Sequence, residues 1–84
     1  MKTKDYGLAS LMLSKGKKLL NHQPDEYGRY WFEFEDDEQL ENDFYTNDAV
    51  VHVQDFINAQ RRIKSLIFKS NEIKYARIEK GAVG

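Results

Sequence analysis

The side chains that could carry chemistry in this 84-residue chain are fourteen carboxylates, thirteen lysines and arginines, and two histidines. There is no cysteine, which excludes disulfides, thiolate nucleophiles, zinc–thiolate sites and iron–sulfur clusters. His22 and His52 lie far apart and lack the H-x-x-x-H spacing of a zinc site. The acidic run that begins at Asp36 lacks the glycine and the spacing of a calcium loop. We therefore predict neither a metal nor a cofactor.

Glu33 and Glu35 are the carboxylates with the spacing closest to that of a hydrolytic pair. On a strand they would share one face about 7 Å apart. A general acid needs burial to become protonated at neutral pH, and a solvent-facing strand does not provide it. The serines have no neighbouring histidine and carboxylate, and the chain has no glycine-rich phosphate loop. We expect a protein that is not an enzyme.

The charges form three blocks that the net value of −1 conceals. Residues 1–24 sum to +4, residues 25–55 to −10, and residues 56–84 to +5. Such a chain either folds its basic ends back on its acidic middle or presents two faces of opposite sign to partners. We expect the first, since most charge asymmetry in small domains is part of a solvated surface.

A partner protein is the first candidate ligand, and the acidic block would bind it. The segment Glu33–Asp43 holds seven carboxylates and no base, and Trp31 would lie on the same strand face as Glu33. An aromatic anchor among charges is typical of interface hot spots. The competing interpretation is that Trp31 packs under the last helix or the C-terminal segment and the acids only keep the protein soluble. The candidate protein-binding residues are Trp31, Glu33, Glu35, Asp37 and Glu41.

Nucleic acid is the alternative ligand, bound by the basic face of the last predicted helix. The candidate residues are Arg61, Arg62, Lys64 and Lys69. A sequence pI near 6.1 argues against this alternative, because nucleic-acid-binding domains usually carry a strong positive charge. Ile57 and Phe68 flank the core stripe of the same helix, which keeps a homodimer open as a third option.

Local signals define the elements that must position these residues. Apolar residues at helical spacing between Asp5 and Gly16 predict a first helix, capped by Thr3 or Asp5 and ended by Gly16. The turn-forming segment 23–28 precedes an alternating segment, 30–35, which predicts a β-hairpin.

Two helices follow the predicted hairpin. Asp36 and Asp37 can cap a second helix through Thr46. A third, amphipathic helix is predicted over Gln54–Lys69, and we expect it to end at Ser70-Asn71. The sequence therefore predicts a small α+β domain, α-β-β-α-α, whose two-stranded antiparallel hairpin packs against the C-terminal amphipathic helix. The expected core contains Leu8, Leu11, Met12, Leu20, Phe32, Phe34, Leu40, Phe44, Phe56, Ile63, Leu66 and Ile67.

The length fits one domain, which we place at residues 3–70, with 71–84 as a C-terminal extension whose order the sequence leaves open. A chain of this length would have a radius of gyration of about 12 Å. Apolar residues make up 40% of the chain, too many for a disordered protein.

No apolar run is long enough to span a bilayer, and the N-terminus lacks the apolar stretch of a secretory signal. We expect a cytoplasmic protein.

The order of elements resembles a family of short proteins of unknown function encoded by phages, prophages and mobile elements of Gram-positive bacteria. The similarity covers residues 3–69, and the extension 71–84 departs from it. The resemblance implies a fold and a genomic origin, with no catalytic motif to transfer. With the acidic surface, it implies an accessory protein that binds a host or phage protein, and inhibition of host defence is one form of such binding. The matching positions are Leu8-Ala9, Gly16, Phe32-Glu33-Phe34, Phe44-Tyr45, Phe56 and Ile63-Lys64-Ser65-Leu66-Ile67-Phe68.

Overall fold

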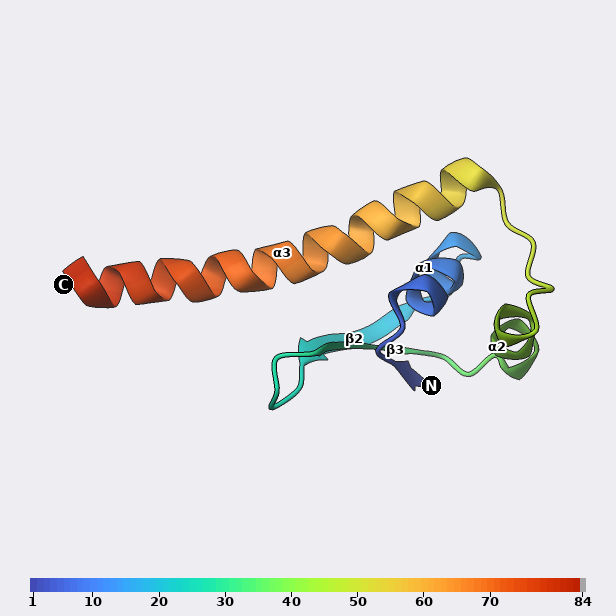
Figure 1. Cartoon of the computed structure of the whole chain (residues 1–84), viewed down its shortest axis with the longest axis horizontal. Helices are drawn as coiled ribbons and strands as arrows, with labels where there is room; N and C mark the ends of the chain where they lie inside the picture. The colour runs from blue at the N-terminus through green and yellow to red at the C-terminus, as the bar shows by residue number, and fades with distance from the viewer. Residues whose placement is uncertain (84) are drawn as a thin grey trace.

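A computed structural model describes the backbone of residues 1–83 and the side chains of residues 1–69. It confirms a small α+β domain with a three-stranded antiparallel sheet and three helices (Figure 1). In chain order the elements are β1 (Lys2–Thr3), α1 (Tyr6–Ser14), β2 (Leu19–Pro24), β3 (Tyr30–Phe34), α2 (Glu38–Tyr45) and α3 (Val53–Val83).

Cap residues fix both ends of α1, as the sequence predicts. The Asp5 carboxylate accepts hydrogen bonds from the backbone N–H groups of Gly7 and Leu8, at 2.8 and 3.2 Å. It thereby satisfies two donors that have no partner inside the helix. Gly16 follows the helix with φ 79°, a left-handed conformation that glycine adopts without strain.

The sheet has one more strand than the sequence predicts. β3 lies in the centre, with β2 on one side and the two-residue β1 on the other, in the order β1-β3-β2. Lys2 is opposite Glu33, and Thr3 is opposite Phe32. The backbone N–H of Phe34 donates to the Met1 carbonyl at 2.9 Å, which extends this pairing by one residue. Two residues are too few to produce a visible alternation, so the sequence gives no signal for β1.

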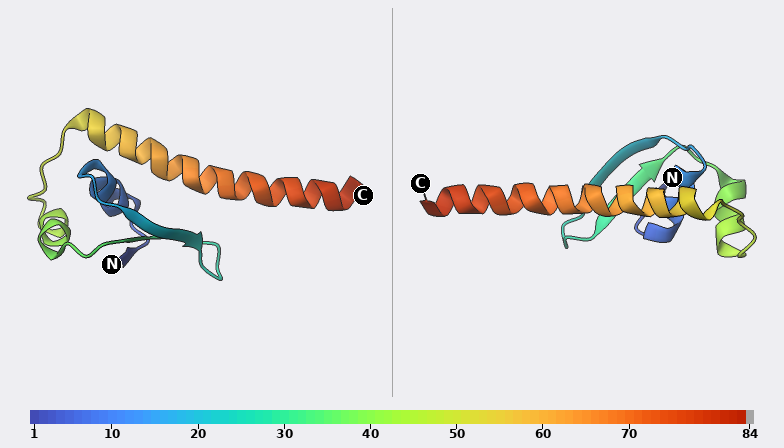
Figure 2. Two further views of the ribbon diagram at one scale, coloured as in Figure 1. Left: turned by 180° about the vertical axis from the view of Figure 1, so that it is seen from behind. Right: turned by 90° about the horizontal axis from the view of Figure 1, so that it is seen from above.

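One face of the sheet contributes the core. Along β3, Tyr30, Phe32 and Phe34 are buried, and Trp31 and Glu33 are only half-buried. Helix α1 lies against the buried face and α3 packs against α1, so α1 sits between the sheet and α3 (Figure 2). The buried cluster is completed by Leu8, Ala9, Leu11, Met12 and Ile63.

Leu20 was predicted to lie in the core, and this prediction is wrong, since 49% of the residue is exposed. The register of β2 shifts between Leu19 and Asn21, so Leu20 falls in an irregularity of the strand. Such an irregularity breaks the inward and outward alternation on which the prediction depends. Five other predicted core residues pack against the cluster without being fully buried: Leu40, Phe44, Phe56, Leu66 and Ile67.

Helix α3 is longer than predicted and gives the molecule its shape. It continues past Ser70-Asn71 to Val83, so the predicted helix end there is wrong. Neither residue breaks a helix as glycine or proline does, and both are tolerated inside one. The C-terminal part of α3 projects beyond the rest of the domain (Figure 1). The radius of gyration is consequently 15.1 Å, larger than the value expected for a compact chain, and the longest extent is 52 Å.

Candidate protein-binding surface

The sheet face opposite the core carries the candidate aromatic anchor. Because side chains alternate along β3, Trp31 and Glu33 lie on this outer face. All three helices that the structure describes lie on the other side of the sheet or beyond its end (Figures 1 and 2). We call the surface formed by Lys2, Trp31, Glu33, Asn21 and Gln23 the outer sheet face.

Lys2, on the neighbouring strand β1, contacts the ring of Trp31. Its Nζ lies 4.7 Å from the centroid of the Trp31 ring, a cation–π contact. A shallow cavity of about 240 Å³ opens beside the ring and is lined by Lys2, Thr3, Lys4 and Trp31. Within the described residues, Trp31 lies on the sheet face opposite α1 and does not pack under the last helix. The competing interpretation also named the C-terminal segment, whose side chains lie outside the described residues. The outer sheet face therefore offers a partly covered aromatic ring with room beside it.

The five predicted binding residues lie in two different parts of the structure, at strand β3 and at the start of α2. Trp31 and Glu33 share the outer sheet face, and Glu35 is exposed just beyond the end of β3. Asp37 and Glu41 belong instead to the start of α2, and Glu41 is half-buried in its first turn. Negative charge in the first turn favours a helix, so both acids have a structural role there.

Asp37 has two structural partners. Its carboxylate accepts from the backbone N–H of Leu40 at 3.1 Å and pairs with Lys17 Nζ at 2.7 Å. The hydrogen bond from Lys17, followed by the one from Leu40, holds the pKa of Asp37 below its ordinary value. Asp37 is thus the N-cap that the sequence predicts, and its carboxylate is already occupied.

The N-terminal basic block neutralises part of the acidic middle, as expected. Besides Lys17 with Asp37, the amino group of Met1 pairs with Asp36 at 2.6 Å, and Lys4 pairs with Asp25 in the hairpin turn. The hydrogen bond from Lys4, with further bonds from the backbone of Arg29 and Tyr27, lowers the pKa of Asp25. These pairs join the N-terminal segment to the β2–β3 hairpin and to α2.

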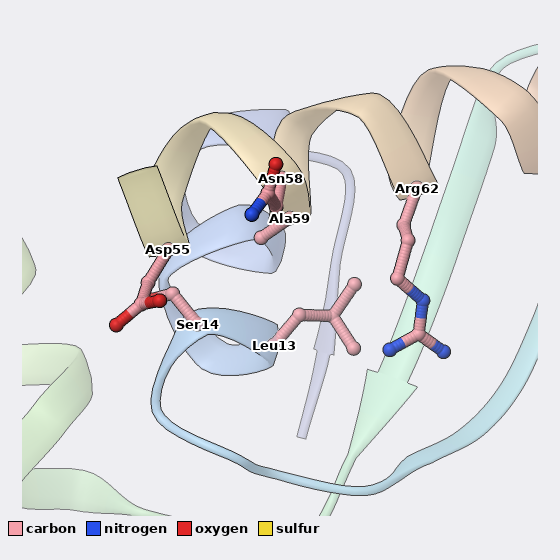
Figure 3. A pocket seen from close by; sticks show the side chains of 6 residues that line it. All are labelled: Leu13, Ser14, Asp55, Asn58, Ala59 and Arg62. Carbon is pink, nitrogen blue, oxygen red and sulfur yellow. The ribbon is translucent and has the colours of Figure 1, made fainter. Parts of the chain in front are cut away.

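The basic block in α3 behaves differently. Arg61, Arg62, Lys64 and Lys69 are all exposed, and within residues 1–69 none of them forms an ion pair. Arg62 lines a cavity of about 180 Å³ between α3 and the end of α1, together with Leu13, Ser14, Asp55, Asn58 and Ala59 (Figure 3). The expected neutralisation therefore does not extend to the described cations of α3.

The histidines and carboxylates do not gather into a metal site within the described residues. His22 Nδ1 instead lies 2.7 Å from the Tyr30 hydroxyl, next to the core.

Within the described residues, no helix combines the length and the apolar character needed to cross a bilayer.

Sequence reasoning missed the contribution of Lys2 to this surface. The lysine is far from Trp31 in the sequence, and only the pairing of β1 with β3 brings them together. The alternation of residues 30–35 was the signal that placed Trp31 and Glu33 correctly on one face.

Comparison with known proteins gives a match to a family model. A family model described as a domain of unknown function, DUF5659, matches residues 1–69. No curated protein and no solved structure matches the chain. The matched region contains every strand of the sheet, α1, α2 and the part of α3 that packs on α1.

Proposed function

Since the chain belongs to the DUF5659 family, a domain of unknown function, we propose a function from its surfaces: it binds another protein through the outer sheet face and is not an enzyme. One observation carries this proposal. The single tryptophan of the chain lies on the outer sheet face, which no described helix covers (Figure 2), with the Lys2 Nζ 4.7 Å from the centroid of its ring. Tryptophan is among the residues most enriched in binding hot spots.

The chemistry of the outer sheet face defines the partner that would fit it. Trp31 supplies apolar area, and the neighbouring cavity can admit a side chain of the partner. Glu33 on the same face and Glu35 at the end of β3 add negative charge. A partner surface with an apolar side chain flanked by lysine or arginine complements this arrangement.

For the biological setting, we propose an accessory protein of a phage, prophage or mobile element of Gram-positive bacteria, acting in the host cytoplasm. The resemblance of the residue pattern over 3–69 supports this setting. Inhibition of a host defence or nucleic-acid-handling protein is one form that such binding would take, because an acidic surface competes with a phosphate backbone for a basic groove.

The test uses affinity capture from host lysate followed by measurement of the dissociation constant for the captured protein. The variants are Trp31→Ala and the double variant Glu33→Gln with Glu35→Gln. The matched control is Glu38→Gln, which removes one exposed carboxylate from α2. Asp37 is left intact, because its loss would damage the N-cap of α2.

We expect Trp31→Ala to weaken binding by at least about tenfold, in the range of a hot-spot residue, and the glutamate variant to weaken it less. Glu38→Gln should bind as the wild type does. The circular dichroism spectra of all variants should agree. A captured protein that binds Trp31→Ala with unchanged affinity would refute this assignment of the surface.

A second candidate function rests on the cations of α3. Arg61, Arg62, Lys64 and Lys69 are exposed and lack ion pairs within residues 1–69, so a phosphate backbone could reach them. The formal net charge of −1 weighs against this function, which is why we rank it second.

Salt dependence distinguishes the two functions. Binding to DNA or RNA should weaken steeply as salt rises, and replacement of the four α3 cations by glutamine should flatten that dependence. Lys18→Gln, which removes an exposed lysine outside α3, serves as the control. If the wild type does not bind DNA or RNA at low salt, the second function is excluded.

A further inference from the structure

An apolar groove lies between α1, α2 and the connection to α3. Its volume is about 260 Å³, and its apolar lining comes from Leu11, Phe44, Ala49, Val51 and Phe56, with Asn47 at its edge. This is a different surface from the outer sheet face, which lies across the sheet from α1.

The chain around the groove is acidic. The segment 43–56 supplies every lining residue except Leu11, and it contains Asp43 and Asp48 but no lysine or arginine. Its third acid, Asp55, lines the cavity between α3 and the end of α1, together with Arg62. Lys15 reaches this segment from the end of α1, where its Nζ donates to the Val50 carbonyl. The groove therefore favours an apolar side chain with cations beside it.

The outward side of α3 carries a strip with that composition. Ile57, Arg61, Lys64 and Phe68 recur at spacings of four, three and four residues, which places them along one side of the helix. The two cations are exposed, as is Lys69 next to the strip, and 67% of Phe68 is exposed. An exposed phenylalanine among exposed cations is the complement of an apolar groove in an acidic segment.

The strip of one molecule cannot fill its own groove. Phe56 lines the groove and Phe68 lies twelve residues further along the same helix, about 18 Å away at the rise of an α-helix. A rigid helix keeps the two apart. Figure 1 shows the same separation, with α2 at one end of the molecule and the C-terminal part of α3 projecting toward the other.

We propose that the protein associates head to tail, with the α3 strip of one copy seated on the groove of a second copy, Phe68 in the groove and Arg61 and Lys64 facing the acids of segment 43–56. Such an interface joins two different patches, so a chain of copies that does not close into a ring keeps one groove and one strip free at its ends. The average mass of the assemblies therefore grows with protein concentration.

The test is sedimentation velocity on nuclease-treated protein, with mixing of two complementary variants. Phe68→Ser removes the apolar part of the strip and keeps the groove. Ala49→Phe fills the groove and keeps the strip. Asp48→Lys is a second groove variant that places a like charge opposite the strip and does not depend on repacking. Tyr27→Ser, which removes an 83% exposed aromatic in the hairpin turn, is the matched control.

At about 0.02 M salt we expect the average mass of the wild type and of Tyr27→Ser to rise with concentration, and at about 0.5 M salt to fall towards that of the monomer. Phe68→Ser alone and each groove variant alone should remain monomeric. Phe68→Ser mixed with a groove variant should form 1:1 pairs that grow no further, because each pair contains one intact interface.

Three results would overturn the proposal. The first is a wild type that remains monomeric at every concentration at low salt. The second is self-association of the groove variants to the same extent as the wild type, as a twofold contact of α3 with α3 requires. The third is that the mixed variants form no pairs although each is folded by circular dichroism.

Discussion

At the scale of single residues, Gly16 offers the cleanest test of the fold. Its φ of 79° is left-handed, and a Cβ added there would meet no atom within 4 Å. Gly16→Ala therefore introduces backbone strain without a steric clash. We expect the free energy of unfolding to fall by about 1 to 2 kcal/mol, measured by urea denaturation.

Asn47 provides the matching control for Gly16. It is the one non-glycine residue with positive φ in the described part of the chain, at 64°. Because glycine adopts this conformation without strain, Asn47→Gly should leave stability unchanged or slightly raised. If Gly16→Ala were as stable as the wild type, the left-handed conformation at the end of α1 would be wrong.

Residue chemistry that acts locally could be predicted from the sequence. Gly16 was placed correctly, and each N-cap was narrowed to two candidates, from which the structure selects Asp5 and Asp37. A cap acts on backbone groups only two or three residues away, so its signal lies in the local sequence. Lys2 could not be placed, since its contact with Trp31 depends on strand pairing between distant segments.

At the scale of elements, the Lys17–Asp37 pair couples the start of α2 to the segment after α1, and makes that contact pH-dependent. The pKa of Asp37 is lowered in the folded protein by Lys17 and by the Leu40 N–H. A lowered folded pKa means that the stabilisation is present above the unfolded value, about 4, and is lost as the pH falls through the folded value.

Asp37→Asn isolates this charge, because asparagine caps a helix about as well as aspartate. We expect the variant to be less stable than the wild type at pH 6, and the difference to shrink as the pH falls below about 4, by urea denaturation at each pH. Lys17→Gln should remove the same pH-dependent part of the free energy of unfolding. The double variant should then be little less stable than either single variant. A difference that stayed constant with pH would contradict this account.

The element predictions succeeded where periodicity was sustained. Alternation defined β3, and helical spacing defined α1 and the first half of α3. β1 was missed because a two-residue strand has no period. The end of α3 was misplaced because serine and asparagine are weak stop signals without glycine or proline.

At the scale of the whole molecule, the projecting part of α3 sets the dimensions in solution. A dilute sample in about 0.5 M salt should scatter X-rays with a radius of gyration near 15.1 Å. A chain ended at Lys69 retains the region matched by the family model and should approach the value of a compact domain, about 11 Å. Equal radii for the two chains would contradict a continuous helix to Val83.

The distance along the chain between contacting elements predicts the order in which they fold. The β2–β3 hairpin closes a short turn, whereas β1 reaches β3, and α3 reaches α1, across long stretches of chain. Closing a longer loop costs more entropy, so the hairpin can form early and α3 docks late. Substitutions at Ile63 should then speed unfolding, while those at Phe32 should slow refolding. We therefore expect the helix that carries the α3 strip to be the last element to join the core and the first to leave it.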